Sequence, residues 1–184
     1  MISALPRRSA TVVAVAALTG LREGEIRGLQ WHDYDGESLK VQRSVWRTHI
    51  SNPKTESSED RVPVIPSLQN ILNHYRKAIP NAPTDWVFAG ERKHCPLNLA
   101  NLVRREMIAK LKDGTWHGWH GFRRGLTTRL HESGASVEII QEILRHSDPE
   151  VTRDSYIVVQ SGRTDKAMRR VDGKAVLNAW KKSR

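Results

Sequence analysis

The chain has 184 residues and a formal net charge of +10, from 30 Lys and Arg against 20 Asp and Glu. Hydrophobic residues make up 38% of the chain and charged residues 27%, which excludes a disordered or a membrane-embedded composition. The only cysteine, Cys95, excludes an intramolecular disulfide framework and a multi-thiolate metal site. We therefore expect a single cytoplasmic domain with a polyanionic partner, which by charge alone is nucleic acid, an acidic protein or a lipid head group.

The positive charge is unevenly distributed. Residues 101–130 hold seven Lys and Arg against two Asp and Glu, and residues 161–184 hold eight against two. Between these blocks, residues 131–160 hold two basic residues against six acidic ones. Two basic blocks therefore flank an acidic one.

The first part of the chain is expected to begin with a linker remnant over residues 1–8, which carry no hydrophobic period. Ser9 is placed to cap a helix over Ala10–Leu18, and Gly20 is placed to end it. A second helix is predicted over Glu23–Leu29, with Ile26 and Leu29 facing inward.

Two strands are predicted next, over Ser38–His49 and Arg61–Ile65, because both segments are rich in β-branched and aromatic residues. The polar loop that joins them contains Lys54. Trp86–Ala89 is predicted to be a short buried strand.

The remaining elements are helical by periodicity, capping residues and stop signals. Helices are predicted over Leu68–Ala78, Leu99–Leu111, Gly121–Glu132, Val137–Leu144 and Glu150–Val158. The tail, Thr164–Lys182, is compatible with a helix that is interrupted at Asp172-Gly173. The sequence thus predicts an α+β fold, mainly α-helical with a small antiparallel β-sheet, over residues 9–160, followed by a basic tail over residues 161–184.

Dispersed cations and one tyrosine are the candidate functional residues, since the chain has no glycine-rich phosphate loop, no GxSxG elbow and no HExxH pair. Taken one at a time, each has an ordinary structural interpretation as a surface cation, a helix cap or a core tyrosine. His120 and Arg123 stand three residues apart, on one face at a helix N-terminus, where anions are favoured. His117 and His120 have no carboxylate cluster beside them, so we expect no metal and no cofactor.

The order of these residues carries more information than any one of them. Arg22, Lys54, His120-x-x-Arg123, His146 and Tyr156 resemble the tyrosine recombinase (phage integrase) family. Further matching segments are Thr19-Gly20-Leu21-Arg22-x-Gly24-Glu25 with Leu29-x-Trp31, Arg123-Arg124-Gly125-x-Thr127-Thr128, Ile140-Gln141-x-x-Leu144 and Leu144-Arg145-His146-Ser147. The resemblance covers residues 9–160, the length of the family's catalytic domain.

Two positions depart from the family pattern. The family usually has glycine where Arg145 stands, so a tight turn is expected to become bulkier and cationic. Phe122 replaces the usual leucine before the second arginine. Neither departure removes a catalytic group.

The resemblance implies the DNA breaking-rejoining catalytic core and a covalent 3′-phosphotyrosyl intermediate. It assigns Tyr156 as nucleophile, Arg22 and Arg123 as phosphate ligands, and Lys54 as the general acid for the 5′ oxygen. His120 is then the proton acceptor or a phosphate ligand, His146 a phosphate hydrogen-bond donor, and Glu25 a brace for the arginines. This chemistry needs neither metal nor cofactor.

The implied partner is double-stranded DNA, bound by a tetramer in the full-length protein, with accessory DNA-bending proteins as further candidates. We expect the family's N-terminal core-binding domain to be absent from this chain. Residues 161–184 are a candidate for a helix exchanged between protomers, or else a solvated basic tail. A DNA-binding module without catalysis and a type IB topoisomerase-like relaxing enzyme are the alternatives. The target sequence and a phage, mobile-element or chromosomal role stay open.

Overall fold

The computed structural model describes residues 2–51, 61–79, 85–90, 95–111, 115–145, 162–171 and 173–183. Lys54, His146 and Tyr156 lie outside these residues, as does the helix predicted over Glu150–Val158. In the described part of the chain, no helix is long and apolar enough to cross a membrane.

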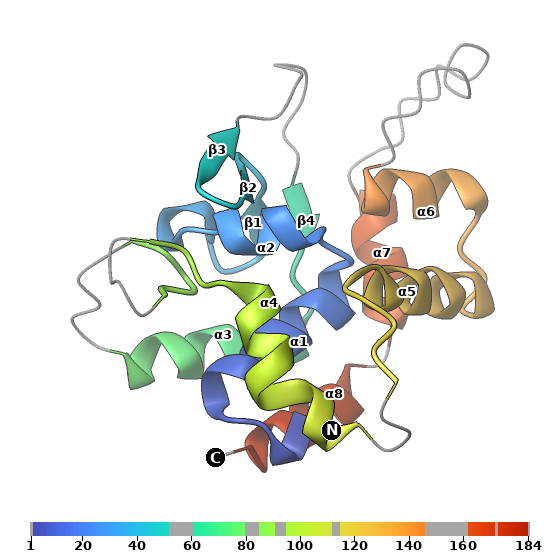
Figure 1. Ribbon diagram of the computed structural model, residues 1–184. Helices are drawn as coiled ribbons and strands as arrows, with labels where there is room; N and C mark the ends of the chain where they lie inside the picture. The colour runs from blue at the N-terminus through green and yellow to red at the C-terminus, as the bar shows by residue number, and fades with distance from the viewer. Residues whose placement is uncertain are drawn as a thin grey trace.

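Helix α1 (Arg7–Thr19) is the centre of the fold, and every residue from Ser9 to Thr19 is buried. A helix that is apolar on all sides must be covered on all sides. Helices α3 (Pro66–Ala78), α5 (His120–Glu132) and α8 (Lys174–Lys181) all pack against it (Figure 1). The predicted helix over Ala10–Leu18 is confirmed, and Gly20 ends it in the left-handed conformation. Ser9 does not cap it, because the helix begins two residues earlier, at Arg7.

The N-terminal residues differ from the expected linker. Ile2–Ala4 forms a 3-10 helix that contacts α8, and α1 already begins at Arg7. Leu5 is completely buried in the core. The apolar side chains among these few residues therefore fold as part of the domain, which hydrophobic periodicity could not show over so short a segment.

The strands form two antiparallel ribbons instead of the single sheet that the sequence predicted. β1 (Ser38–Lys40) pairs with β4 (Arg61–Pro63), and β2 (Ser44–Trp46) pairs with β3 (His49–Ser51). The predicted long strand is broken twice, over residues 41–43 between β1 and β2 and at the reversal between β2 and β3, where Arg47 has a φ of 52°. Helix α2 (Glu23–Gly28) packs against β2, and the ribbons lie beside α2 (Figure 1).

The region after the ribbons is helical, as predicted over Leu99–Leu111, but its hydrogen-bond pattern changes twice. It runs as α4 (Leu99–Leu102), a π-helix over Val103–Met107 and a 3-10 helix over Ile108–Lys110. The side chain of Asn98 caps α4 by accepting from the N–H of Asn101. The predicted strand near Trp86–Ala89 is reduced to isolated bridges, although Val87 and Phe88 are buried.

Helices α5, α6 (Val137–Leu144) and α7 (Gly162–Arg170) gather on the side of α1 opposite α3 (Figure 1). α8 follows α7 and packs on α1 and α3 of its own chain. Trp180 anchors it: the residue is 4% exposed, its indole N–H donates to Thr11 Oγ1 at 2.9 Å, and the Arg7 guanidinium lies over the ring face. The predicted interruption of the tail at Asp172-Gly173 separates α7 from α8.

Candidate active site

Gly20 brings the ends of three helices together. Its φ of +65° is the left-handed conformation that favours glycine, and its Cα lies so close to its neighbours that a Cβ would stand 2.8 Å from Cδ2 of Leu144 and 3.1 Å from Cδ2 of Leu126. The end of α1 therefore packs directly on α5 and α6. The turn that follows carries Arg22 into the same region.

Arg22 precedes α2 and is held by the third residue of that helix. Glu25 Oε2 accepts the backbone N–H of Arg22 at 2.7 Å, and Oε1 accepts Nη1 of the same residue at 3.0 Å. The reach of a glutamate back to the residue before the helix is one half of a capping box. Glu25 is 12% exposed and Arg22 is 42% exposed, so the guanidinium is fixed on one side and open to solvent on the other.

Arg123 lies on α5 and is buried, with an exposed fraction of 7%. Its Nη1 donates to the carbonyl of Gly20 at 2.8 Å, and its Nη2 donates to the carbonyl of Leu144. These bonds join the α1–α2 turn to the end of α6. A guanidinium has five N–H donors, so Arg123 retains donors for a further acceptor.

Arg145 contacts the same carboxylate as Arg22. It ends α6 in the left-handed conformation, with φ 52° and ψ 54°. The bulkier residue therefore keeps the tight turn in which the family usually has glycine. Its Nη2 donates to Glu25 Oε2 at 2.7 Å, in an ion pair whose two side chains are 10% and 12% exposed.

The site has a surplus of positive charge, because three guanidinium groups surround one carboxylate. Burial lowers the pKa of Arg123 to about 10, and the charges of Arg22 and Arg145 act in the same direction. Burial favours the neutral form of Glu25, but Arg145 and Arg22 outweigh this effect and bring its pKa below the ordinary value. With three guanidinium groups and one carboxylate, the formal charges of the site sum to +2, which suits an anionic ligand.

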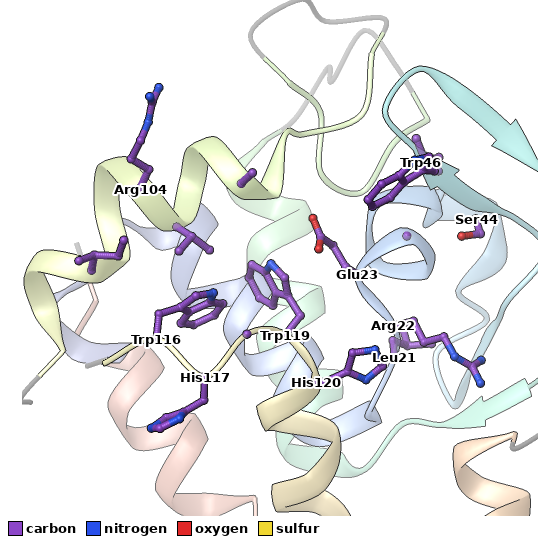
Figure 2. A pocket seen from close by; sticks show the side chains of 16 residues that line it. Leu21, Arg22, Glu23, Ser44, Trp46, Arg104, Trp116, His117, Trp119 and His120 are labelled. Atoms are coloured by element: carbon purple, nitrogen blue, oxygen red, sulfur yellow. The ribbon is translucent and has the colours of Figure 1, made fainter. Parts of the chain in front are cut away.

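His120 is exposed at the N-terminus of α5, on the rim of a pocket of about 880 Å³. Arg22 lines the same pocket, together with Trp46, Trp116 and Trp119. Figure 2 shows the ring of His120 between Trp119 and Arg22, whose guanidinium points away from Trp116 and Trp119. Sequence reasoning missed this aromatic lining, although the density of tryptophan just before His120 was a signal for it.

The structure thus brings together Arg22, Glu25 and Arg123 of the predicted site and places His120 on the adjoining rim. Lys54 belongs to the connection between β3 and β4, and His146 follows Arg145 directly in the chain; both lie outside the described residues, as does Tyr156. Within the described ranges, no three His, Cys, Asp or Glu residues form a group that could hold a metal ion.

Comparison of the sequence with protein families agrees with this geometry. The family model described as the phage integrase family matches residues 2–163. The chain therefore belongs to the phage integrase family, whose catalytic members are the tyrosine recombinases that the order of its motifs resembles.

Curated relatives carry matching names. A tyrosine recombinase XerC-like protein of Caldanaerobacter subterraneus is 27% identical over 166 residues, which cover 75% of this chain and 42% of that protein. The ICEBs1 integrase of Bacillus subtilis is 28% identical over 162 residues, covering 79% of this chain and 44% of the relative. The chain thus spans less than half the length of these relatives.

Solved structures show the same fold. The Tn1549 transposon integrase in complex with circular intermediate DNA aligns with a TM-score of 0.64 and 20% identity, over 89% of this chain and 59% of that chain. The XerA recombinase aligns with a TM-score of 0.60 and 18% identity, over 95% of this chain and 57% of that chain. The predicted fold class, a mainly helical tyrosine recombinase catalytic core with small antiparallel β-structure, is confirmed.

Proposed function

We propose that this chain is the catalytic domain of a site-specific DNA recombinase, which cleaves and rejoins DNA strands through a covalent 3′-phosphotyrosyl intermediate. One observation carries the proposal: Arg22 and Arg123, far apart in the sequence, converge on one cationic site beside His120. The names of the relatives support it, and they favour neither a topoisomerase nor a module without catalysis. Because the proposed substrate is DNA, we expect the activity in the cytoplasm.

The two arginines suit a phosphate in chemistry and in position. A guanidinium donates two parallel hydrogen bonds to phosphate oxygens and stays protonated at neutral pH. Arg22 is anchored through Glu25 while its side chain remains partly exposed, and Arg123 is fixed through two backbone carbonyls. Donors held in place before the reaction stabilise the charge of a transition state without reorganisation, each by about 10²–10³-fold in rate.

Burial of the other tyrosines supports Tyr156 as nucleophile. The chain has three tyrosines. Tyr34 and Tyr75 are 8% and 5% exposed. Burial raises the pKa of both phenols, that of Tyr75 to about 12. A core phenol that resists ionisation suits neither contact with DNA nor attack on phosphorus, which leaves Tyr156 for this step.

The proposed reaction conserves the number of phosphodiester bonds. The phenol oxygen of Tyr156 attacks phosphorus while its proton passes to His120. The bond from phosphorus to the 5′ oxygen breaks, and Lys54 protonates that oxygen, while His146 donates a hydrogen bond to the phosphate. Because the phosphotyrosyl bond retains the energy of the cleaved linkage, the reverse reaction rejoins DNA without ATP.

Covalent capture tests this function even when the target site is unknown. The chain is incubated with a pool of nicked duplexes whose sequence is randomised on both sides of the nick. The short strand released next to the nick diffuses away, so the protein–DNA adduct accumulates and its DNA can be sequenced. We expect an adduct on a denaturing gel.

The matched controls are two tyrosine variants. Tyr156→Phe should form no adduct, whereas Tyr34→Phe should form it as the wild type does, because Tyr34 is a core residue whose hydroxyl bonds to Gly36 and Asn73. Absence of an adduct from wild-type protein that still binds DNA in a gel-shift assay would contradict the proposal.

The assembly is proposed from the resemblance alone. We propose a tetramer on two DNA sites for the full-length protein, with DNA-bending proteins as accessory factors. Exchange of residues 161–184 between protomers requires α8 to leave α1 and α3, where Trp180 is buried. Cysteines introduced in α8 and α3 should therefore cross-link between protomers on DNA if the exchange occurs, and only within one chain otherwise.

A further inference from the structure

Arg145 has no part in the mechanism described above, although it lies in the same site. From the end of α6 it contacts Glu25, and it shares Oε2 of that carboxylate with the backbone N–H of Arg22. Its Nη1 is buried and, within the described residues, has no hydrogen-bond partner. A buried guanidinium nitrogen in this state is unusual, because proteins pair the donors that they bury.

The backbone at Arg145 indicates that the side chain has a use. The residue adopts a left-handed conformation that glycine accommodates with less strain, and its N–H donates to the carbonyls of Gln141 and Glu142. Glycine would make the same turn without burying a charge. The ion pair with Glu25 is what the arginine adds at this position.

The net charge of the site suggests a function for the Arg145 side chain. Arg22, Arg123, Arg145 and Glu25 sum to +2. Without Arg145 the sum is +1, which equals the single negative charge of a phosphodiester in magnitude. Attack by a phenolate gives a pentacoordinate phosphate with two negative charges. The third guanidinium therefore complements the transition state more than the substrate, and such an excess accelerates the reaction instead of tightening binding.

Resting on the proposed function, we propose that Arg145 is a positioning residue of the phosphate site: it holds Glu25 against Arg22 and supplies a third positive charge for the transition state. Glu25 is the physical link, since it bonds Arg22 through Oε1 and Arg145 through Oε2. Arg123 is the second link, because it donates to the carbonyl of the residue just before Arg145.

The test compares three variants on a duplex obtained from the covalent capture pool. Arg145→Gly and Arg145→Gln remove the charge, and Arg145→Lys keeps it. We expect the first two to slow single-turnover adduct formation at saturating DNA by about 10- to 100-fold, with DNA affinity changed by less than about threefold. Arg145→Lys should recover to within about fivefold of the wild-type rate.

Two measurements distinguish this role of Arg145 from a purely structural one: the stability of the variants, and their cleavage rate on a substrate without the phosphate charge. Arg145→Gly gains from a backbone that suits glycine and loses the ion pair with Glu25, which keeps its bonds to Arg22, so its urea unfolding curve should show a fully folded protein under the assay conditions. With a neutral methylphosphonate at the scissile position, wild type and Arg145→Gly should differ by less than about threefold, since one negative charge is gone. Wild-type cleavage by Arg145→Gly, or a loss of activity that follows a loss of stability, would overturn the proposal.

A second readout does not depend on cleavage. The Nε–Hε resonances of Arg22 and Arg123 are followed by NMR while inorganic phosphate is added. We expect Arg145→Gly to bind the phosphate dianion, which carries the two negative charges of the transition state and not the single charge of a phosphodiester, at least about threefold more weakly than wild type. Equal affinity would overturn the role of Arg145. If the wild type forms no adduct at all, the proposed function fails, and this titration still decides on Arg145.

Discussion

Replacing Glu25 with glutamine tests how the site is held together. The side chain keeps its shape but loses the charge shared by Arg22 and Arg145. Removing one partner of a buried ion pair lowers the free energy of unfolding by about 3–5 kcal/mol. An ion pair with an exposed partner contributes only about 0.5 kcal/mol to that free energy. Arg145 is 10% exposed and Arg22 is 42% exposed. Since the amide oxygen still accepts one bond, we expect a loss of about 3 kcal/mol in unfolding free energy.

Urea unfolding at pH 7 measures this loss, and Glu23→Gln is the matched control. Glu23 lies in the same first turn of α2 but is partly exposed, and its neutralisation should change the free energy of unfolding by about 0.5 kcal/mol or less. An equal effect of the two substitutions would show that Glu25 is not the shared counter-charge of the arginines.

The pH dependence gives the same prediction a second test. The pKa of Glu25 is below its ordinary value in the folded protein, so its contribution to stability is present above the unfolded pKa and is lost as pH falls through the folded pKa. The difference in stability between wild type and Glu25→Gln should therefore shrink on acidification below pH 4.5, the ordinary pKa of a glutamate side chain. A difference that stays constant from pH 7 to acid unfolding would show that the ionised form of Glu25 does not stabilise the folded protein.

Three further predictions concern the fold and the phosphate ligands. Gly20→Ala should lower the free energy of unfolding by about 2–3 kcal/mol in a thermal melt, because it adds a clash to an unfavourable φ. Gly134→Ala, at φ +80° with open space around it, should lower it by only about 1 kcal/mol, and equal losses would contradict the tight packing at Gly20. Trp180→Ala should cost about 3 kcal/mol and expose α8 to trypsin, so unchanged proteolysis would contradict the docking of α8. Arg22→Ala should slow adduct formation by about 10²–10³-fold, whereas the exposed Arg124 on α5 should be replaceable by alanine with less than about a threefold change in that rate; similar effects would argue against a specific role for Arg22.

Local signals predicted most of the helices. Gly20 ends α1 and Val137–Leu144 forms α6, as capping residues and periodicity indicated. Periodicity indicated a helix over Leu99–Leu111 but could not show its π and 3-10 turns, because these differ only in which carbonyl oxygen accepts each backbone N–H. The break of the long strand at Arg47 was also hidden, since a left-handed arginine leaves no compositional signal.

The candidate site was predictable in its residue types and not in its contacts. The order of motifs identified Arg22, Glu25 and Arg123 as members of one site. The pairing of Glu25 with Arg145 depends on how the turn after α1 packs against the end of α6, which no local pattern specifies. The departure of Arg145 from the family's glycine was visible, but its partner across the fold was not.

In the proposed reaction, Tyr156 attacks a phosphate held by Arg22 and Arg123. The most direct measurement is mass spectrometry of the captured adduct after digestion with trypsin and nuclease, which identifies the residue that carries the nucleotide. We expect a nucleotide joined to Tyr156 through a 3′-phosphotyrosyl bond in the wild type and no adduct in Tyr156→Phe. A nucleotide on any other residue, or an adduct that persists in Tyr156→Phe, would contradict it.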